Sequence, residues 1–155
     1  MARLASGVAI VACLDRGQPR GLLISSLTSL SLEPPRMLFC VRKAAGSHDA
    51  LYLAHRCSLS ILSEHDAEEA ERFSAAGRAD ERFAAGDWRL QPGSPPVYAR
   101  ALVGLTGVIS GRTDAGSHSV FFLDIEAVET RNAAPLVYFD RAFRALDPTD
   151  PSGRS

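Results

Sequence analysis

The stretch Gly21-Leu-Leu-Ile-Ser-Ser-Leu-Thr-Ser-Leu-Ser-Leu-Glu-Pro-Pro35 places five hydroxyl side chains between two apolar runs and ends in a double proline. Small hydroxyl residues let a ligand approach the backbone, and they can hydrogen-bond a polar ring or a phosphate. Pro34 and Pro35 cannot donate to a β-ladder, so we expect a turn or a sheet edge before Met37. Composition alone is equally consistent with a Ser/Thr-rich edge strand that binds no ligand.

A basic loop follows the next apolar run, residues 37–41. It reads Arg42-Lys43-Ala-Ala-Gly46-Ser47, and Ser47 is a good N-cap for a helix that we expect to reach about His55. Two cations and the free amides of a helix start would then converge, which is an arrangement that suits a phosphate. An ordinary capped helix with two solvated bases is the alternative.

The remaining pattern predicts strands with helices inserted in the middle of the chain. Strands are expected at 7–14, 21–26, 56–62, 99–109, 119–128 and 135–140. The alternation in 56–62 predicts a half-buried strand, and Ser63-Glu-His-Asp66 is a capping-box pattern before a helix at 67–73. Residues 110–116 are expected to form a hairpin-like loop.

Composition predicts a single domain with a short tail. Residues 147–155 contain two prolines and no large hydrophobic residue, so we expect this tail to be disordered. The domain is therefore predicted over residues 1–146.

Taken in order, these segments resemble the flavin reductase-like family, whose members bind FMN or FAD on a split β-barrel. The match is nearly full over Thr28-Ser29-Leu30-Ser31-Leu32-Glu33-Pro34-Pro35. It continues through Cys40-Val41-Arg42, Ser47-His48-Asp49, Arg72-Phe73, Arg82-Phe83, Trp88, Gly116-Ser117-His118-Ser119 and Pro135-Leu-Val-Tyr138-Phe-Asp-Arg141. The resemblance implies a mainly β fold with inserted helices (α+β), in the form of a split β-barrel of the flavin reductase type.

The resemblance also implies a set of site residues. The expected flavin-binding residues are Leu23, Ile24, Ser25, Ser26, Ser31, Cys40, Val41, Arg42, Lys43, Ser47, Phe73 and Ser74. The expected NAD(P)H-binding residues are His118, Tyr138, Phe139 and Arg141. His118 is expected to be catalytic by positioning the dihydronicotinamide, although it could instead merely open a strand. The family usually has threonine-alanine-asparagine-serine where this chain has Leu23-Ile24-Ser25-Ser26, so a serine hydroxyl replaces an amide.

The implied function is an NAD(P)H:flavin oxidoreductase that transfers hydride from NAD(P)H to FMN or FAD. Its reduced flavin would supply a partner flavin-dependent monooxygenase, and the protein would be a homodimer. A flavoprotein that retains its flavin for other redox chemistry is one alternative. A flavin-binding or degenerate dimerisation module without reductase activity is another, because the asparagine is missing.

Charge and targeting features argue against several other classes. The net charge of −1 gives no electrostatic reason to bind nucleic acid or an anionic membrane. No apolar run is long enough to span a bilayer and the N-terminus lacks a secretory pattern, so we expect a cytoplasmic protein.

Other site chemistries find no support in the sequence. The cysteines Cys13, Cys40 and Cys57 have no close spacing and the histidines form no metal signature, so we expect neither a disulfide framework nor a metal. No G-x-S-x-G elbow supports a hydrolase.

Overall fold

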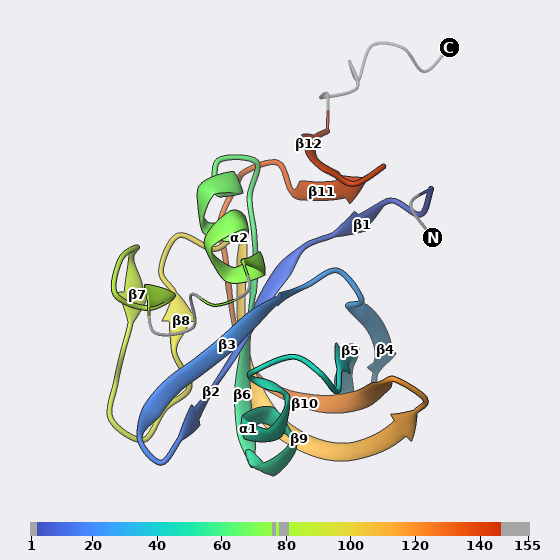
Figure 1. Cartoon of the computed structure of the whole chain (residues 1–155), viewed down its shortest axis with the longest axis vertical. Coiled ribbons are helices and arrows are strands. Elements are labelled where there is room, and N and C mark those ends of the chain that lie inside the picture. The colour runs from blue at the N-terminus through green and yellow to red at the C-terminus, as the bar shows by residue number, and fades with distance from the viewer. Residues whose placement is uncertain (1–2, 76, 78–80, 147–155) are drawn as a thin grey trace.

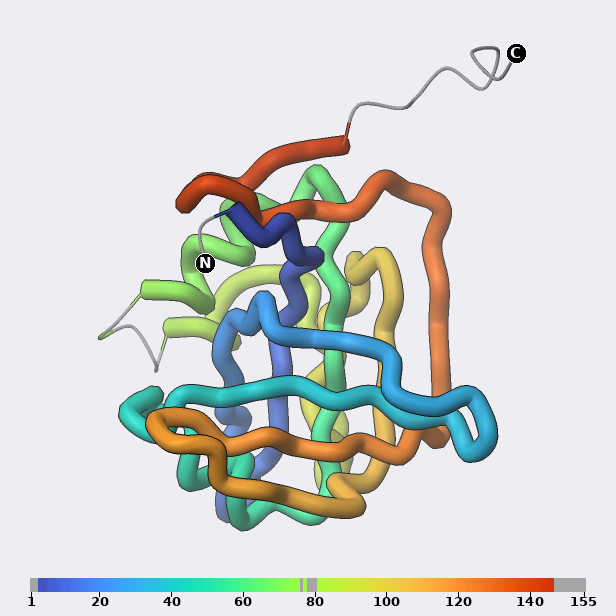
Figure 2. The backbone as a smooth tube through the Cα atoms, turned by 90° about the vertical axis from the view of Figure 1, so that its right-hand side faces the viewer, coloured from blue at the N-terminus to red at the C-terminus, as the bar shows by residue number. Residues whose placement is uncertain are grey.

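The computed structural model describes residues 3–75, 77 and 81–146. Most of this part of the chain forms one antiparallel seven-stranded sheet in the order β3-β2-β6-β9-β10-β5-β4. Its strands are β2 (Ala9–Asp15), β3 (Gln18–Ile24), β4 (Thr28–Leu32), β5 (Pro35–Arg42), β6 (Arg56–Ile61), β9 (Val103–Ala115) and β10 (His118–Thr130). The sheet curls so that β5, β9 and β10 run across β2 and β3 (Figures 1 and 2). Its edge strands β3 and β4 are not paired with each other in the described residues, so the sheet is open.

Two smaller sheets and two helices complete the described structure. The three-stranded sheet is formed by β1 (Ser6–Gly7), β11 (Leu136–Phe139) and β12 (Ala142–Ala145), and it therefore joins the two ends of the described chain (Figure 1). The two-stranded sheet is formed by β7 (Trp88–Arg89) and β8 (Val97–Tyr98). The helices are α1 (His48–Leu53) and α2 (Ala67–Ser74). The prediction of a mainly β fold with inserted helices is confirmed.

Strand β2 is buried on both faces, which explains why its sequence is apolar without alternation. Val11 packs in a core inside the curled sheet with Phe39 and Phe121, whose rings are stacked 5.1 Å apart. Ile10 lies in a second core on the opposite face, together with Phe73 of α2. Strand β2 therefore contributes side chains to both hydrophobic cores.

The hydroxyl-rich stretch forms an edge, as its sequence predicts. β4 is the outermost strand beside β5, and the chain turns at Glu33 and Pro34. Pro35 then opens β5, where its missing N–H costs little because it is the first residue of the strand.

The prediction that β6 is half-buried is wrong. The residues from Cys57 to Ser60 are all buried, because β6 lies between β2 and β9 in the middle of the sheet. Its two buried serines have hydrogen-bond partners: Ser58 donates to the Pro96 carbonyl, and Ser60 accepts from the Tyr98 N–H at 3.1 Å. These bonds offset the cost of burying the hydroxyls.

The predicted hairpin between the two strands is present, but its loop is shorter than the predicted 110–116, because β9 continues to Ala115. Asp114 pairs with Ser119, and only Gly116 and Ser117 form the turn, with Gly116 at a φ of 59°. The polar side chains that resemble a loop sequence instead face solvent or make specific bonds across the hairpin. Earlier in β9, Gly107 lies so close to β10 that an added Cβ would stand 2.0 Å from the Asp124 carbonyl oxygen.

The strand predicted at 135–140 is followed by one that was not predicted, β12. The turn between β11 and β12 contains Asp140 and Arg141 at φ angles of 49° and 64°. Both residues occupy the left-handed region, which glycine or asparagine usually fills in such turns. The sequence therefore lacks the usual hairpin signal at this turn.

Both helices begin near the predicted places, although their expected caps differ. Ser47 precedes α1, but its hydroxyl donates to the Gly21 carbonyl at 3.0 Å and makes no cap bond. At α2 the N-cap is Asp66, which makes no side-chain cap bond; its carboxylate instead accepts from the Ser63 N–H at 2.9 Å, ahead of the helix. The predicted tail, residues 147–155, lies outside the described residues. Among the described residues, no helix is both long enough and apolar enough to cross a membrane.

Candidate functional site

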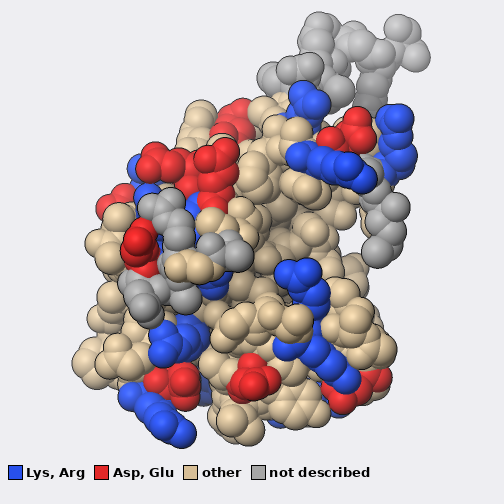
Figure 3. Space-filling view, viewed as in Figure 1, with Lys and Arg blue, Asp and Glu red and all other residues tan. Residues whose placement is uncertain are grey.

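A cleft of about 840 Å³ lies between the large sheet and the small sheet β1-β11-β12. Several predicted site residues, which come from distant parts of the sequence, meet in this cleft. These residues are Leu23, Ile24, Ser25, Ser26, Cys40, Val41, Arg42, His118, Tyr138 and Arg141. The space-filling view shows the surface hollowed on this side, with basic side chains on both sides of the hollow (Figure 3).

The pairing of β5 with β10 forms one wall of the cleft. Arg42 is directly opposite His118, and Cys40 is directly opposite Val120. Alternate residues of a strand point to the same face, so these four side chains share the cleft face of the sheet. His118 is the first residue of β10, one residue before the predicted start of this strand, and it is exposed.

Ser26 holds the segment after β3 against this wall. Its hydroxyl donates to the Cys40 carbonyl at 2.8 Å and accepts from the Cys40 N–H at 3.1 Å. This hydroxyl therefore bonds both backbone groups of Cys40, as a neighbouring strand would, and fixes the segment after β3 against β5. The neighbouring Ser25 is exposed, and its hydroxyl has no partner among the described residues.

The cleft has a positive character. Arg42 and Arg141 line it, and none of its described lining residues is an aspartate or a glutamate. Arg141 reaches the cleft from the left-handed turn between β11 and β12. Non-glycine residues held in this conformation cost about 1–3 kcal/mol each and cluster at functional sites. An anionic ligand with a flat apolar part would match these groups.

Two residues of the predicted phosphate loop lie outside the cleft lining. Lys43 forms an ion pair with Asp114 at 3.0 Å, and this bond is the main reason why the pKa of Asp114 lies below its ordinary value. Ser47 is buried, with its hydroxyl bonded to Gly21. The first amide of α1 is also occupied, because His48 N–H donates to the Ala45 carbonyl. Of the charged groups predicted there, Arg42 alone lines the cleft.

Four more predicted residues are not among those that line the cleft. Ser31 lies on the edge strand β4, and Phe139 lies on β11 opposite Ala142. Phe73 is fully buried against Phe83 and Trp88, and Ser74 donates to a carbonyl of its own helix. Their assignment to flavin or NAD(P)H binding stays a prediction.

The cleft also contains residues that the sequence did not indicate. They are Leu4, Ser6, Leu22, Ala45, Ala115 and Val120. Val120 could have been inferred from His118, since residues two apart in a strand face the same side. Leu4 and Ser6 have no local signal, because they reach the cleft through the pairing of β1 with β11.

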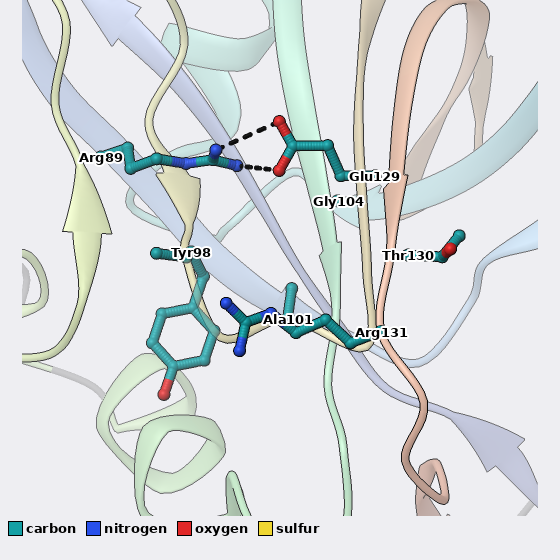
Figure 4. A pocket seen from close by; sticks show the side chains of 8 residues that line it. Arg89, Tyr98, Ala101, Gly104, Glu129, Thr130 and Arg131 are labelled. Carbon is teal, nitrogen blue, oxygen red and sulfur yellow. Dashed lines mark hydrogen bonds and ion pairs between the residues drawn. The ribbon is translucent and has the colours of Figure 1, made fainter.

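A second cavity, of about 420 Å³, lies at the other end of β9 and β10. Figure 4 shows its wall, where Arg89 donates two bonds, of 3.1 and 2.6 Å, to Glu129. These bonds hold the pKa of Glu129 below its ordinary value. None of the predicted site residues lines this cavity.

Comparisons with known proteins agree with the resemblance seen in the sequence. A family model described as flavin reductase like domain matches residues 1–147. The FMN reductase (NADH) RutF 1 of Methylorubrum extorquens is 36% identical over 154 residues, which cover 99% of this chain and 76% of that protein. HsaB of Rhodococcus jostii, a reductase subunit of a flavin-dependent monooxygenase, is 28% identical over 149 residues. The match covers 96% of this chain and 75% of HsaB.

One solved structure with a similar fold contains bound ligands. The NADH:FAD oxidoreductase SgcE6 of Streptomyces globisporus, in complex with NAD and FAD fragments, superimposes with a TM-score of 0.87. It is 26% identical, and the superposition covers 96% of this chain and 89% of that one.

Proposed function

This chain belongs to the flavin reductase-like family, and we propose that it is an NAD(P)H:flavin oxidoreductase acting on FMN or FAD. The observation that carries the proposal is the cleft, where Arg42 and His118 stand on one wall and Tyr138 and Arg141 on another. These residues come from three separate parts of the sequence. Their meeting in one cleft supports a common role.

The lining fits a flavin in size and in chemistry. A volume of about 840 Å³ lies within the range of small-molecule sites, which are mostly apolar with a few polar groups. Leu23, Ile24 and Val120 offer apolar surface to a planar ring. Arg42 would bind a phosphate group, and the unpartnered hydroxyl of Ser25 would bond the polar edge of the ring.

The protein contributes orientation rather than acid or base catalysis. When bound, the flavin supplies the acceptor for the hydride that leaves C4 of the dihydronicotinamide. We assign to His118 the positioning of the nicotinamide, and to Tyr138 and Arg141 the enclosure of NAD(P)H. Leu23 and Ile24 exclude water from this part of the cleft. Correct placement alone accounts for a large part of the rate in such transfers.

We further propose the bounds of the domain, its fold, its oligomeric state and its partner. The domain comprises residues 1–146 and is a split β-barrel, which the curled open sheet supports. We also propose that the protein is a homodimer, as the resemblance to the family implies. The protein would act in the cytoplasm and supply reduced flavin to a flavin-dependent monooxygenase, as the likeness to HsaB supports.

The direct test measures NADH oxidation by the purified protein with FMN, with FAD and without added flavin. We expect oxidation that depends on added flavin, together with binding of flavin to the apo-protein. A protein that binds flavin but leaves both NADH and NADPH unoxidised would contradict the proposed reaction. Light scattering of the same sample tests the homodimer.

A further inference from the structure

His118 stands between two serines: Ser117 is held by the segment that joins β5 to α1, and Ser119 is held by the first residue of α1. The Ser117 carbonyl accepts from the Lys43 N–H at 2.9 Å, and the Ser117 hydroxyl lies 2.9 Å from Nδ1 of His118. Ser119 points to the opposite face of β10 from His118 and is fully buried. The backbone of His118 is therefore fixed from both sides.

The buried side of this arrangement is a chain of hydrogen bonds. Oγ of Ser119 lies 2.9 Å from Nε2 of His48 and donates to Oδ1 of Asp114, also at 2.9 Å. The other carboxylate oxygen of Asp114 accepts from Nζ of Lys43 at 3.0 Å. The chain thus ties the start of α1 to both strands of the β9–β10 hairpin that carries His118.

The number of available protons sets the direction of each bond. Asp114 is ionised at neutral pH and accepts only, so it takes the single hydroxyl proton of Ser119. Ser119 must then accept from His48, which places a proton on Nε2. Nδ1 of His48 lies 2.9 Å from Oδ1 of Asp49, whose side chain is 95% exposed.

His48 is well suited to hold Ser119 in one position. The residue is 7% exposed, its ring stacks on Tyr52 at 5.5 Å, and the rings of His48 and Phe121 meet edge to face at 6.3 Å. A buried imidazole without partners would be costly, so its bond to Ser119 is strongly favoured.

The contacts Asp49–His48–Ser119 have the order of a hydrolase triad, but they cannot perform its chemistry. Ser119 has no exposed surface, so no substrate reaches its oxygen. Its proton is directed to Asp114 rather than to His48, and His48 donates instead of acting as a base. The chain of bonds is therefore suited to hold the hairpin and not to attack a substrate.

We infer that His48 is a positioning residue, which fixes His118 in the cleft through Ser119 and the β9–β10 turn. The inference rests on the proposed role of His118 in placing the dihydronicotinamide. A donor at position 48 then keeps His118 in register with Arg42, although His48 is not among the described residues that line the cleft.

The test compares His48→Leu, which removes the donor, with His48→Gln, whose amide N–H can still reach Ser119. Stopped-flow reduction of bound flavin at saturating NADH isolates the hydride step. We expect His48→Leu to slow this step by about ten-fold through misplacement of His118 and His48→Gln to restore most of the rate. Flavin affinity should be unchanged in both. Equal rates in His48→Leu and the parent protein would overturn the inference.

Two further variants keep the test decisive. Ser119→Ala deletes one buried oxygen and reaches the same chain from its other end, so it serves if His48→Leu does not fold. In the double variant with His48→Leu and Ser119→Ala, the loss in the rate of flavin reduction should not exceed that of the larger single change, since both changes act through one bond. Fully additive losses would contradict a shared path.

A readout independent of activity separates this inference from the proposed function. Amide hydrogen exchange at Ser117, His118 and Ser119 should speed up in His48→Leu and stay slow in His48→Gln. Unchanged exchange in His48→Leu would overturn the inference even in an active enzyme. A His118→Ala protein that reduces flavin at the parental rate would instead refute the role of His118 while leaving the structural coupling measurable.

Discussion

Arg42 and His118 are direct cross-strand partners on β5 and β10, and both side chains line the cleft. Side chains at such paired positions are about 4.5–5.5 Å apart at Cβ. The proposed phosphate-binding cation and the proposed nicotinamide-positioning imidazole are therefore immediate neighbours. Binding of the two ligands can be separated only by variants that change one partner and keep the other.

His118→Ala should leave flavin affinity nearly unchanged and lower kcat/KM for NADH. The loss of one orienting hydrogen bond corresponds to about 1–3 kcal/mol, or roughly five- to a hundred-fold in rate. Stopped-flow reduction by NADH and flavin titration would measure the two effects. His65→Ala changes an exposed histidine outside the cleft and is the matched control. Weaker flavin binding in His118→Ala would assign the residue to the flavin site instead.

Arg42→Ala and Ser47→Ala should change different properties, flavin affinity in the first and stability in the second, although the sequence places both residues in one loop. Arg42→Ala should weaken flavin binding by about 1–3 kcal/mol at unchanged stability, since a charge-assisted bond is lost. Ser47→Ala should lower the free energy of unfolding by about 0.5–1.5 kcal/mol and leave flavin affinity unchanged. The cost is modest because the Gly21 carbonyl keeps its bond from Arg82 at 2.6 Å. Flavin titration and urea unfolding decide the assignment, and a flavin defect in Ser47→Ala would reverse it.

Arg141→Gly should separate backbone strain from ligand binding. Glycine relieves the left-handed conformation, which costs other residues about 1–2 kcal/mol, at the expense of some chain entropy. We expect the free energy of unfolding to stay level or rise by up to about 1 kcal/mol, while KM for NADH rises about ten-fold. Asp140→Gly relieves the neighbouring residue and keeps the cation, so its KM should match the parent. A parental KM in Arg141→Gly would remove Arg141 from the site.

Asp124→Asn should destabilise the protein at neutral pH but not in strong acid. Asp124 accepts two bonds from its cross-strand partner Arg36, at 2.5 and 3.0 Å, and these bonds are the main reason why its pKa lies below the ordinary value of 3.8. A lowered carboxyl pKa stabilises the fold above the ordinary value and loses this contribution as pH falls through the folded-state pKa. The difference in unfolding free energy between parent and variant should therefore be constant above about pH 5 and vanish well below pH ~3.8. A difference that persists in strong acid would assign the effect to packing.

Local patterns predicted the parts of this fold that depend on neighbouring residues. The Ser/Thr-rich stretch with Pro34 and Pro35 had to form an edge, and the apolar runs had to form strands. The order of motifs also predicted the cleft residues on β3, β5, β10 and β11. For the edge and the strands the physical reason lies within a few residues of the pattern, whereas the cleft residues were predicted from the resemblance to the family.

Partners far apart in the sequence account for most of what was missed. Ser47 is a good cap by type, but its hydroxyl is used by Gly21, 26 residues away. His48 meets Ser119 across 71 residues, and no local pattern reports such a contact. The burial of Ser58 likewise depends on Pro96, which follows 38 residues later.

The cleft has one wall from the middle of the chain and another from its two ends, because β1 pairs with β11. Proteins fold from the N-terminus onward as they leave the ribosome. The Arg42 wall can therefore form only once β10 has been synthesised, and Tyr138 and Arg141 can close the cleft only after synthesis has passed β12. A nascent chain would present the Arg42 wall before Tyr138 and Arg141 cover it, so on the proposed roles the capture of NAD(P)H would be the last property that the protein acquires.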